Sequence, residues 1–475
     1  MFSLKKITNA FQWSVMRSFV KQFLVPLLRI FIIPIVGPSN YGVVAIVFLY
    51  FGFMEIIFPF GIRDFILSKY INDKNHLRML HTISFFLSII ALILCLILSF
   101  FLFLYYDSSE ISLAFLITSL LFPILGLGLV PQTIIEKKLD IKHLFLISLI
   151  PCITSIFIAL PLAILGYGFW SILIGHILNY AISNLIFFYM NPISFLIPSR
   201  DYILKLFSFG KWNTAEKASE YFIWWIDLFF ISFLGVEISG IYGLGKNFAM
   251  LLFTMLTSPV VSIILPIFGA MKKNVKKLST VFVSVINTSM IINIVFGFSA
   301  SLISYYFFQN FFLNWKDLDI ICLYMFISTI FSRSFPLLRE KLKVRNQIRS
   351  YPLLLIILIL IFIILFFILK PLIITDFLRL KFLNDLIFAF FMILLLMNII
   401  RNEKHSFQNF ISGMKQVIFL FLINFCAVFY IIELFKYEGL NLNLIFIFML
   451  IIFYFFSVYR LLRKNITDLN NLYLR

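Results

Sequence analysis

Residues 80–104 read LHTISFFLSIIALILCLILSFFLFL, a run of 25 residues without Lys, Arg, Asp or Glu. A helix rises about 1.5 Å per residue, so this run is long enough to cross a hydrocarbon core of roughly 30 Å. About fourteen apolar runs of comparable kind follow one another along the 475 residues. The predicted spans are 12–36, 42–62, 80–104, 111–130, 144–164, 169–190, 212–234, 241–268, 279–307, 319–337, 352–374, 384–400, 416–435 and 440–459. The sequence therefore predicts an all-α polytopic membrane protein.

The composition excludes several soluble classes of protein. Hydrophobic residues make up 62% of the chain and charged residues only 13%. Soluble globular proteins are roughly 45–50% apolar and about 25% charged. A water-soluble enzyme, a nucleic-acid-binding domain and a disordered protein are therefore excluded, although the net charge is +18.

The basic residues predict the orientation of the chain in the membrane. When the N-terminus is placed inside, 28 of the 39 Lys and Arg residues fall on the inner side and 5 on the outer side. This bias follows the positive-inside rule. It predicts an even number of helices with both termini cytoplasmic. The basic segments 131–143 and 338–351 are expected to lie along the inner membrane surface, and ordinary basic loops are the alternative.

An internal repeat joins residues 23–46 to residues 221–244 at a constant offset of 198. The offset aligns Gly37 with Gly235 and Gly42 with Gly240, at a turn between two predicted spans. Six spans separate the two copies, so both have the same orientation in the membrane. The pattern predicts a parallel repeat about an axis along the membrane normal, an arrangement found in transporters with a site between their halves.

Charged residues lie within the predicted spans, where a charge is costly and usually faces a cavity or a partner. The cations predicted to line a substrate cavity are Arg17, Lys21, Arg29, Lys217, Lys246 and Arg333. The acids predicted to serve in gating or ion coupling are Asp227, Glu220, Glu216 and Glu55. The net charge of these six cations and four acids is +2, which favours an anionic substrate such as a pyrophosphate.

The repeat also suggests one specific ion pair. Arg29 and Asp227 occupy equivalent positions in its two copies, and we expect them to pair across the cavity. The alternative is that backbone or water satisfies each charge separately. For Arg17 and Lys21, the alternative to the cavity is snorkelling to the headgroups.

No catalytic or metal site is recognisable. Residues 240–246 fit the pattern G-x₄-G-K, but Asn247 follows where a phosphate-binding loop needs Ser or Thr. The five histidines and four cysteines show no metal-ligand spacing. We therefore expect no metal, no cofactor and no enzymatic activity.

Several short motifs occur in a consistent order over residues 1–275. They are GPSNYGVV (37–44), IIEKKLD (134–140), GYGFWS (166–171), FSFG (207–210), the segment 235–246, and the Ser-Pro and Leu-Pro pairs at 258–259 and 265–266. Together they resemble the polysaccharide-exporting branch of the multidrug/oligosaccharidyl-lipid/polysaccharide exporter superfamily. The chain looks like an O-antigen or colanic-acid-type flippase, although Ser39 and Pro34 depart from the usual pattern.

The resemblance implies two six-helix lobes around a central cavity, at 1–195 and 196–410, followed by two additional helices and a cytoplasmic tail at 411–475. It implies a multi-pass protein of the bacterial cytoplasmic membrane. The implied partner is a polyprenyl-pyrophosphate-linked oligosaccharide that alternating access moves from the inner to the outer leaflet. Coupling to H⁺ or Na⁺ and contact with polysaccharide polymerase or assembly proteins are further expectations.

The sequence is less consistent with three other functions. A cation-coupled small-molecule exporter of the same superfamily would have an acidic cavity, which the net +2 disfavours. A membrane-embedded polymerase or glycosyltransferase would need a long loop or domain for its chemistry. A purely structural scaffold would not need the ten charged residues named above.

Overall fold

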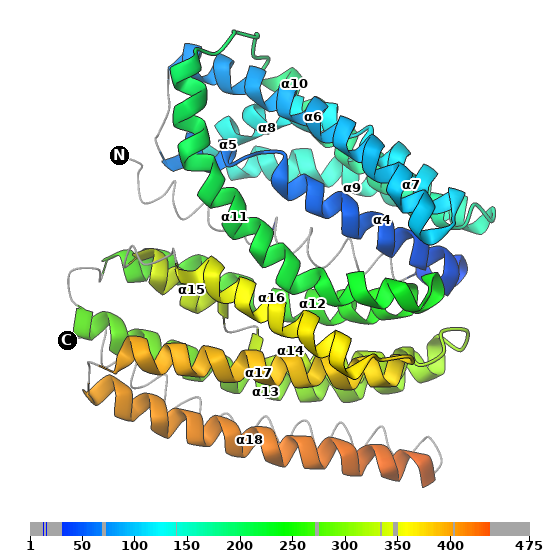
Figure 1. Ribbon diagram of the computed structural model, residues 1–475, viewed down its shortest axis with the longest axis vertical. Helices are drawn as coiled ribbons and strands as arrows, with labels where there is room; N and C mark the ends of the chain where they lie inside the picture. The colour runs from blue at the N-terminus through cyan, green and yellow to red at the C-terminus, as the bar shows by residue number, and fades with distance from the viewer. Residues whose placement is uncertain are drawn as a thin grey trace. The chain divides into compact units, whose positions relative to one another are not determined.

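The computed structural model describes residues 13, 16, 31–68, 73–138, 140–270, 275–332, 335–344, 350–401 and 404–437. Every regular element in these ranges is a helix, as predicted (Figure 1). The helices of the first half are α3 (Ile33–Val36), α4 (Pro38–Ile57), α5 (Ile62–Ser68), α6 (Lys74–Tyr106), α7 (Ser109–Ser119), α8 (Phe122–Lys137), α9 (Ile141–Ile164), α10 (Phe169–Met190) and α11 (Arg200–Ile231).

The second half continues with helices only. They are η2 (Ser232–Leu234), α12 (Val236–Ala270), α13 (Val275–Phe311), α14 (Leu318–Ser332), α15 (Phe335–Val344), α16 (Ser350–Leu369), α17 (Ile374–Ile400) and α18 (Lys404–Tyr437). Nine helices in the described ranges are long and apolar enough to cross a membrane. The protein is therefore a multi-pass membrane protein. The count of fourteen stays a prediction, because the span 440–459 and most of 12–36 lie outside the described residues.

The ends of the helices follow local chemistry. The Asp73 side chain accepts a hydrogen bond from the Asn75 amide at 3.0 Å and so caps the start of α6. Ser108 caps α7 in the same way. Gly37 precedes Pro38, the first residue of α4, and its φ of +82° suits a residue without a Cβ.

The chain divides into two compact units, Met1–Leu244 and Gly245–Arg475. In the first unit, α10 packs on α8 and α9, and α6 packs on α7 and α8. In the same unit, α11 lies along α4 (Figure 1). In the second unit, α13 packs on α14 and α18, while α17 contacts α14 and α16. The lobe boundaries at 195 and 410 stay predictions.

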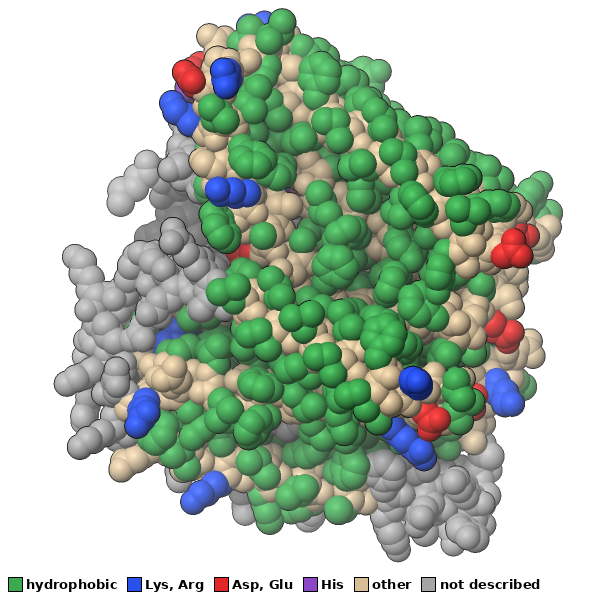
Figure 2. Space-filling model, in the orientation of Figure 1, with side chains coloured by type: hydrophobic (Ala, Val, Ile, Leu, Met, Phe, Trp, Pro, Cys, Tyr) green, Lys and Arg blue, Asp and Glu red, His purple; other side chains and the backbone are tan. Residues whose placement is uncertain are grey.

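Hydrophobic side chains cover most of the visible face of each unit, with few charges among them (Figure 2). Phe86, Ile90 and Ile97 project from α6 with about half or more of their surface exposed. The outward faces of α16 are similarly apolar. This is the surface expected of helices that contact lipid tails.

The basic segment 131–143 joins two helices. Helix α8 continues through Pro131 to Lys137, and α9 begins at Ile141. The position of this segment relative to the membrane surface stays a prediction. The segment 338–351 overlaps a separate short helix, α15, in which Leu337, Leu338 and Leu342 are buried. Its position on the membrane surface stays a prediction.

Candidate functional site

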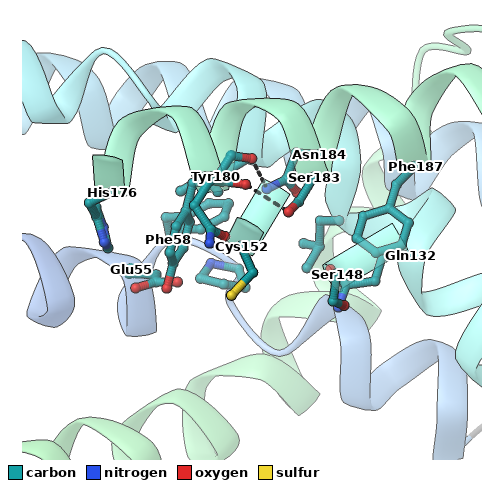
Figure 3. A pocket seen from close by; sticks show the side chains of 14 residues that line it. Glu55, Phe58, Gln132, Ser148, Cys152, His176, Tyr180, Ser183, Asn184 and Phe187 are labelled. Atoms are coloured by element: carbon teal, nitrogen blue, oxygen red, sulfur yellow. Dashed lines mark hydrogen bonds between the residues drawn. The ribbon is translucent and has the colours of Figure 1, made fainter. Parts of the chain in front are cut away.

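The first unit contains a cavity of about 490 Å³ between α4, α8, α9 and α10 (Figure 3). This volume lies within the usual range for small-molecule sites, roughly 300–1,000 Å³. The lining residues are Glu55, Phe58, Pro59, Leu125, Leu129, Gln132, Ser148, Cys152, His176, Asn179, Tyr180, Ser183, Asn184 and Phe187. We call it the unit-1 cavity.

Helix α10 supplies six of these residues in a single stripe. Counted from the first member, their positions are i, i+3, i+4, i+7, i+8 and i+11, which places them on one face of a helix. The stripe consists of His176, Asn179, Tyr180, Ser183, Asn184 and Phe187. The other face of α10 is mainly apolar, so this helix brings polar groups into an otherwise hydrophobic span.

Hydrogen bonds within α10 hold two members of the stripe. Ser183 Oγ donates to the carbonyl oxygen of Asn179 at 2.7 Å, and Asn184 Nδ2 donates to that of Tyr180 at 2.9 Å (Figure 3). A Cβ on Gly128 of α8 would lie 2.2 Å from Asn184 Oδ1. Asn184 therefore serves mainly in the contact between α8 and α10, and Gly128 leaves the space it needs.

Aromatic rings surround His176. Its ring centroid lies 4.5 Å from that of Phe48, 5.7 Å from Phe51 and 4.4 Å from Tyr180. The side chain is 9% exposed. Figure 3 shows His176 near Glu55. Glu55, predicted to serve in gating or ion coupling, thus lies at the wall of a real cavity.

A second polar cluster joins α5, α8 and α11. Arg63 Nε donates to Glu136 Oε2 at 2.8 Å. Asn213 Nδ2 donates to Asp64 Oδ2 at 2.6 Å, and Lys217 Nζ donates to the same oxygen. The structure therefore places Lys217, a predicted pyrophosphate ligand, in an ion pair between α11 and α5.

Asp227 lies near the C-terminal end of α11 and is 1% exposed. Its Oδ2 accepts a hydrogen bond from Tyr242 Oη at 2.7 Å, and its Oδ1 accepts one from the Leu228 amide at 2.8 Å. The bond from Tyr242 joins α11 to α12, whereas the bond from Leu228 lies within α11. The pairing of Asp227 with Arg29 stays a prediction, because Arg29 lies outside the described residues.

Two of the four turn glycines, Gly42 and Gly240, meet near the starts of α4 and α12. A Cβ on Gly42 would lie 1.9 Å from the carbonyl oxygen of Val236, and one on Gly240 would lie 2.2 Å from that of Pro38. Val236 follows Pro38 by the same offset of 198 that relates the two glycines. The contact is therefore symmetric under the predicted repeat. Gly37 and Gly235 both have positive φ, at +82° and +136°.

The other predicted site residues are dispersed. Lys246 is 4% exposed on α12 and belongs to the second unit. Glu216 and Glu220 are half-buried on α11. Arg17, Lys21, Arg29 and Arg333 lie outside the described residues. The predicted cationic cavity therefore stays a prediction, and the unit-1 cavity is a different feature.

The charged residues of the spans did not predict the polar stripe of α10. Gln132 of α8 lies within the predicted inner loop 131–143 and was not predicted as a site residue either. A signal was present: His176, Asn179, Ser183 and Asn184 are uncharged polar residues at helical spacing within the predicted span 169–190. That spacing predicts a polar face on a membrane helix.

Solved structures with the same fold are membrane transporters. The lipid II flippase MurJ in an inward closed conformation matches with a TM-score of 0.71 at 13% identity, over 94% of this chain and 99% of that one. A multidrug resistance MATE family transporter of the MOP superfamily, inward-facing, matches with a TM-score of 0.61 at 16% identity, over 84% and 95%. No curated protein matches by sequence.

The family model described as "Polysaccharide biosynthesis protein" matches residues 34–312, which is more than half of the chain. The matched region contains α4 to α11, the unit-1 cavity and the contact between the turn glycines. The chain belongs to the polysaccharide biosynthesis protein family.

Proposed function

We propose that the protein is a flippase that moves a polyprenyl-pyrophosphate-linked oligosaccharide from the inner to the outer leaflet. The glycan would be the repeat unit of O-antigen or another surface polysaccharide. The family match over residues 34–312 is the observation that carries this proposal. The fold shared with the lipid II flippase MurJ supports it.

The transport cycle would be alternating access between the lobes 1–195 and 196–410. The symmetric contact between Gly42 and Gly240 supports this mechanism, because it joins repeat-related helices through backbone packing alone. A contact without a covalent bond or an ion pair can separate without leaving a buried charge unpaired. The two helices of 411–475 would lie beside this machinery.

The pyrophosphate would bind the predicted cations Arg17, Lys21, Arg29, Lys217, Lys246 and Arg333. Lys217 would first have to leave Asp64, its partner in this structure. Glu55, Glu216, Glu220 and Asp227 would serve in gating or in coupling to H⁺ or Na⁺. The protein would act in the bacterial cytoplasmic membrane, with both termini cytoplasmic, beside polymerase or assembly proteins.

The test is mass spectrometry of lipid extracts from a host that lacks the gene. We expect the complete lipid-linked oligosaccharide to accumulate, and the wild-type gene to clear it. Lys246→Ala should clear it more slowly, because the buried cation is lost. If the amount of lipid-linked oligosaccharide is the same with and without the gene, the flippase proposal is wrong.

The second candidate is a cation-coupled exporter of small molecules. The likeness to a MATE family transporter at a TM-score of 0.61 supports it. This function predicts that the gene changes the efflux of small cationic compounds while the lipid-linked oligosaccharide is unaffected. The same pair of strains therefore separates the two functions.

A further inference from the structure

The polar groups of the unit-1 cavity are suited to bind hydroxyls. Gln132 and Asn179 present amides, Glu55 presents a carboxyl group and Ser183 presents a hydroxyl. Gln132 Nε2 also donates to Glu136 Oε1 at 3.3 Å, which leaves its amide oxygen and its second N–H for a ligand. An amide both donates and accepts hydrogen bonds, whereas a carboxylate accepts them. Because Ser183 Oγ donates within α10, its lone pairs stay available as acceptors. Together these groups complement a ligand with several hydroxyls.

The charge of the cavity argues against a pyrophosphate as its ligand. Glu55 is the only acidic side chain among the described lining residues, and none of them is Lys or Arg. A buried anion without a cationic partner has a large desolvation cost. A pyrophosphate would therefore be disfavoured here, so the ligand is neutral or cationic.

The size of the cavity argues against a lone cation. Oxygen ligands must converge to within roughly 2.3–2.6 Å of an ion such as Ca²⁺. The cavity instead measures about 490 Å³, and its polar groups come from four helices. In the described residues, no group of three or more His, Cys, Asp or Glu side chains is placed to hold a metal ion.

The remaining walls are apolar and partly aromatic. Phe58, Tyr180 and Phe187 line the cavity beside the amides. Phe58 packs on Phe122 at 5.6 Å and Tyr180 on His176 at 4.4 Å, so neighbouring rings hold both in place. A sugar ring has hydroxyls along its edge and C–H groups on its faces. It can bind the amides and the aromatic walls at the same time.

We infer that the unit-1 cavity binds a sugar ring of the transported glycan. This inference rests on the proposed flippase function. Asn179 and Gln132 bind hydroxyls as donor and acceptor, and Glu55 accepts a hydrogen bond from a hydroxyl. Tyr180 and Phe58 contact the faces of the ring. The cavity thereby recognises the sugar, while the pyrophosphate binds elsewhere.

The experiment compares two lipids on the purified full-length protein in nanodiscs. One is the lipid-linked oligosaccharide extracted from the host that lacks the gene. The other is polyprenyl pyrophosphate without sugar. Binding of each is titrated for the wild type, Asn179→Leu, Asn179→Gln and Gln132→Leu. The control is Asn310→Leu, which replaces an asparagine of α13 outside the cavity.

We expect Asn179→Leu and Gln132→Leu each to weaken binding of the glycolipid by roughly tenfold, the effect of a lost hydrogen bond. Binding of the bare lipid should not change. Asn179→Gln keeps the amide and should restore part of the affinity. Asn310→Leu should bind both lipids like the wild type.

Three outcomes would overturn the inference. One is unchanged glycolipid binding in both leucine variants. Another is an equal loss of binding affinity for the two lipids, because the cavity would then not recognise the sugar. The third is a change, in the leucine variants, in how lipid binding depends on Na⁺ or pH. If that change is the same for both lipids, the cavity is a cation site. If the wild type binds neither lipid, the flippase proposal itself fails.

Discussion

At the residue scale, Gly42 and Gly240 are the motif residues with the least space for a side chain. Each has a backbone carbonyl of the other helix where its Cβ would be, at 1.9 Å and 2.2 Å. Only glycine lets two helix backbones approach this closely. The pair therefore explains why the repeat keeps glycine at both positions.

The first prediction concerns this contact. Gly42→Ala should lower the free energy of unfolding by roughly 1–3 kcal/mol, because the methyl group overlaps the Val236 carbonyl. The measurement is the Tm of the purified protein. In a cysteine-free background, a cysteine at Ser239, which is 0% exposed, should also react faster with maleimide.

The control for this prediction is Gly243→Ala on the same helix, α12. Its added methyl group would meet only the side chains of Ala45 at 3.1 Å and Leu228 at 3.7 Å. We expect a smaller change in Tm and no change in maleimide reactivity. If the two variants show the same Tm and the same maleimide reactivity, the contact between Gly42 and Gly240 does not specifically stabilise the packing of α4 on α12.

The second prediction concerns Asp64 and Lys217. Their side chains are 28% and 42% exposed, so solvent screens part of the ion pair. A double-mutant cycle with Asp64→Asn and Lys217→Met should give a coupling energy of roughly 1 kcal/mol. The measurement is Tm for all four proteins. Strict additivity of the two changes would show that the pair does not stabilise this structure.

At the element scale, the hydropathy pattern predicted where helices lie better than where they end. The predicted span 169–190 coincides with α10. The span 212–234 begins twelve residues after α11 does, because the polar start of that helix lowers its hydropathy. A helix ends where caps and turn residues stop it, not where apolar residues stop.

The third prediction concerns the contact of α11 with α4. Tyr221 Oη donates to the carbonyl oxygen of Leu49 at 2.6 Å, and Gly52 leaves space for the ring. Tyr221→Phe should lower the free energy of unfolding by roughly 1 kcal/mol, since one buried hydrogen bond is lost. Chemical unfolding in detergent provides the measurement.

Tyr189→Phe is the control for this contact, because Tyr189 is 76% exposed on α10. It should unfold at the same denaturant concentration as the wild type. A Tyr221→Phe protein as stable as this control would show that the hydrogen bond to α4 contributes nothing measurable.

At the scale of the whole molecule, the fourth prediction concerns orientation in the membrane. Single cysteines are placed at Glu110 and at Arg200, both exposed, after the four native cysteines are replaced. A membrane-impermeant maleimide should label Glu110→Cys in intact cells and Arg200→Cys only after permeabilisation. The physical reason is the excess of Lys and Arg on the side that contains Arg200. The reverse labelling would invert the predicted topology.

The composition and periodicity of the chain determined its class. Continuous apolar runs such as 80–104 must form helices in a bilayer, since each backbone polar group needs a partner and lipid offers none. The distribution of Lys and Arg predicted the orientation. The offset of 198 predicted that Gly42 and Gly240 are equivalent, although nothing in the sequence says that they touch.

Only the tertiary structure decided which residues share a site. Glu55, Gln132 and the stripe of α10 come from separate helices, and they line one cavity because α4, α8 and α10 pack together. Lys217 pairs with Asp64 from α5, 153 residues away in the chain. The periodicity of a helix fixes which of its side chains share a face. Which face meets which neighbour depends on how all the helices pack together, and the sequence pattern does not specify that packing.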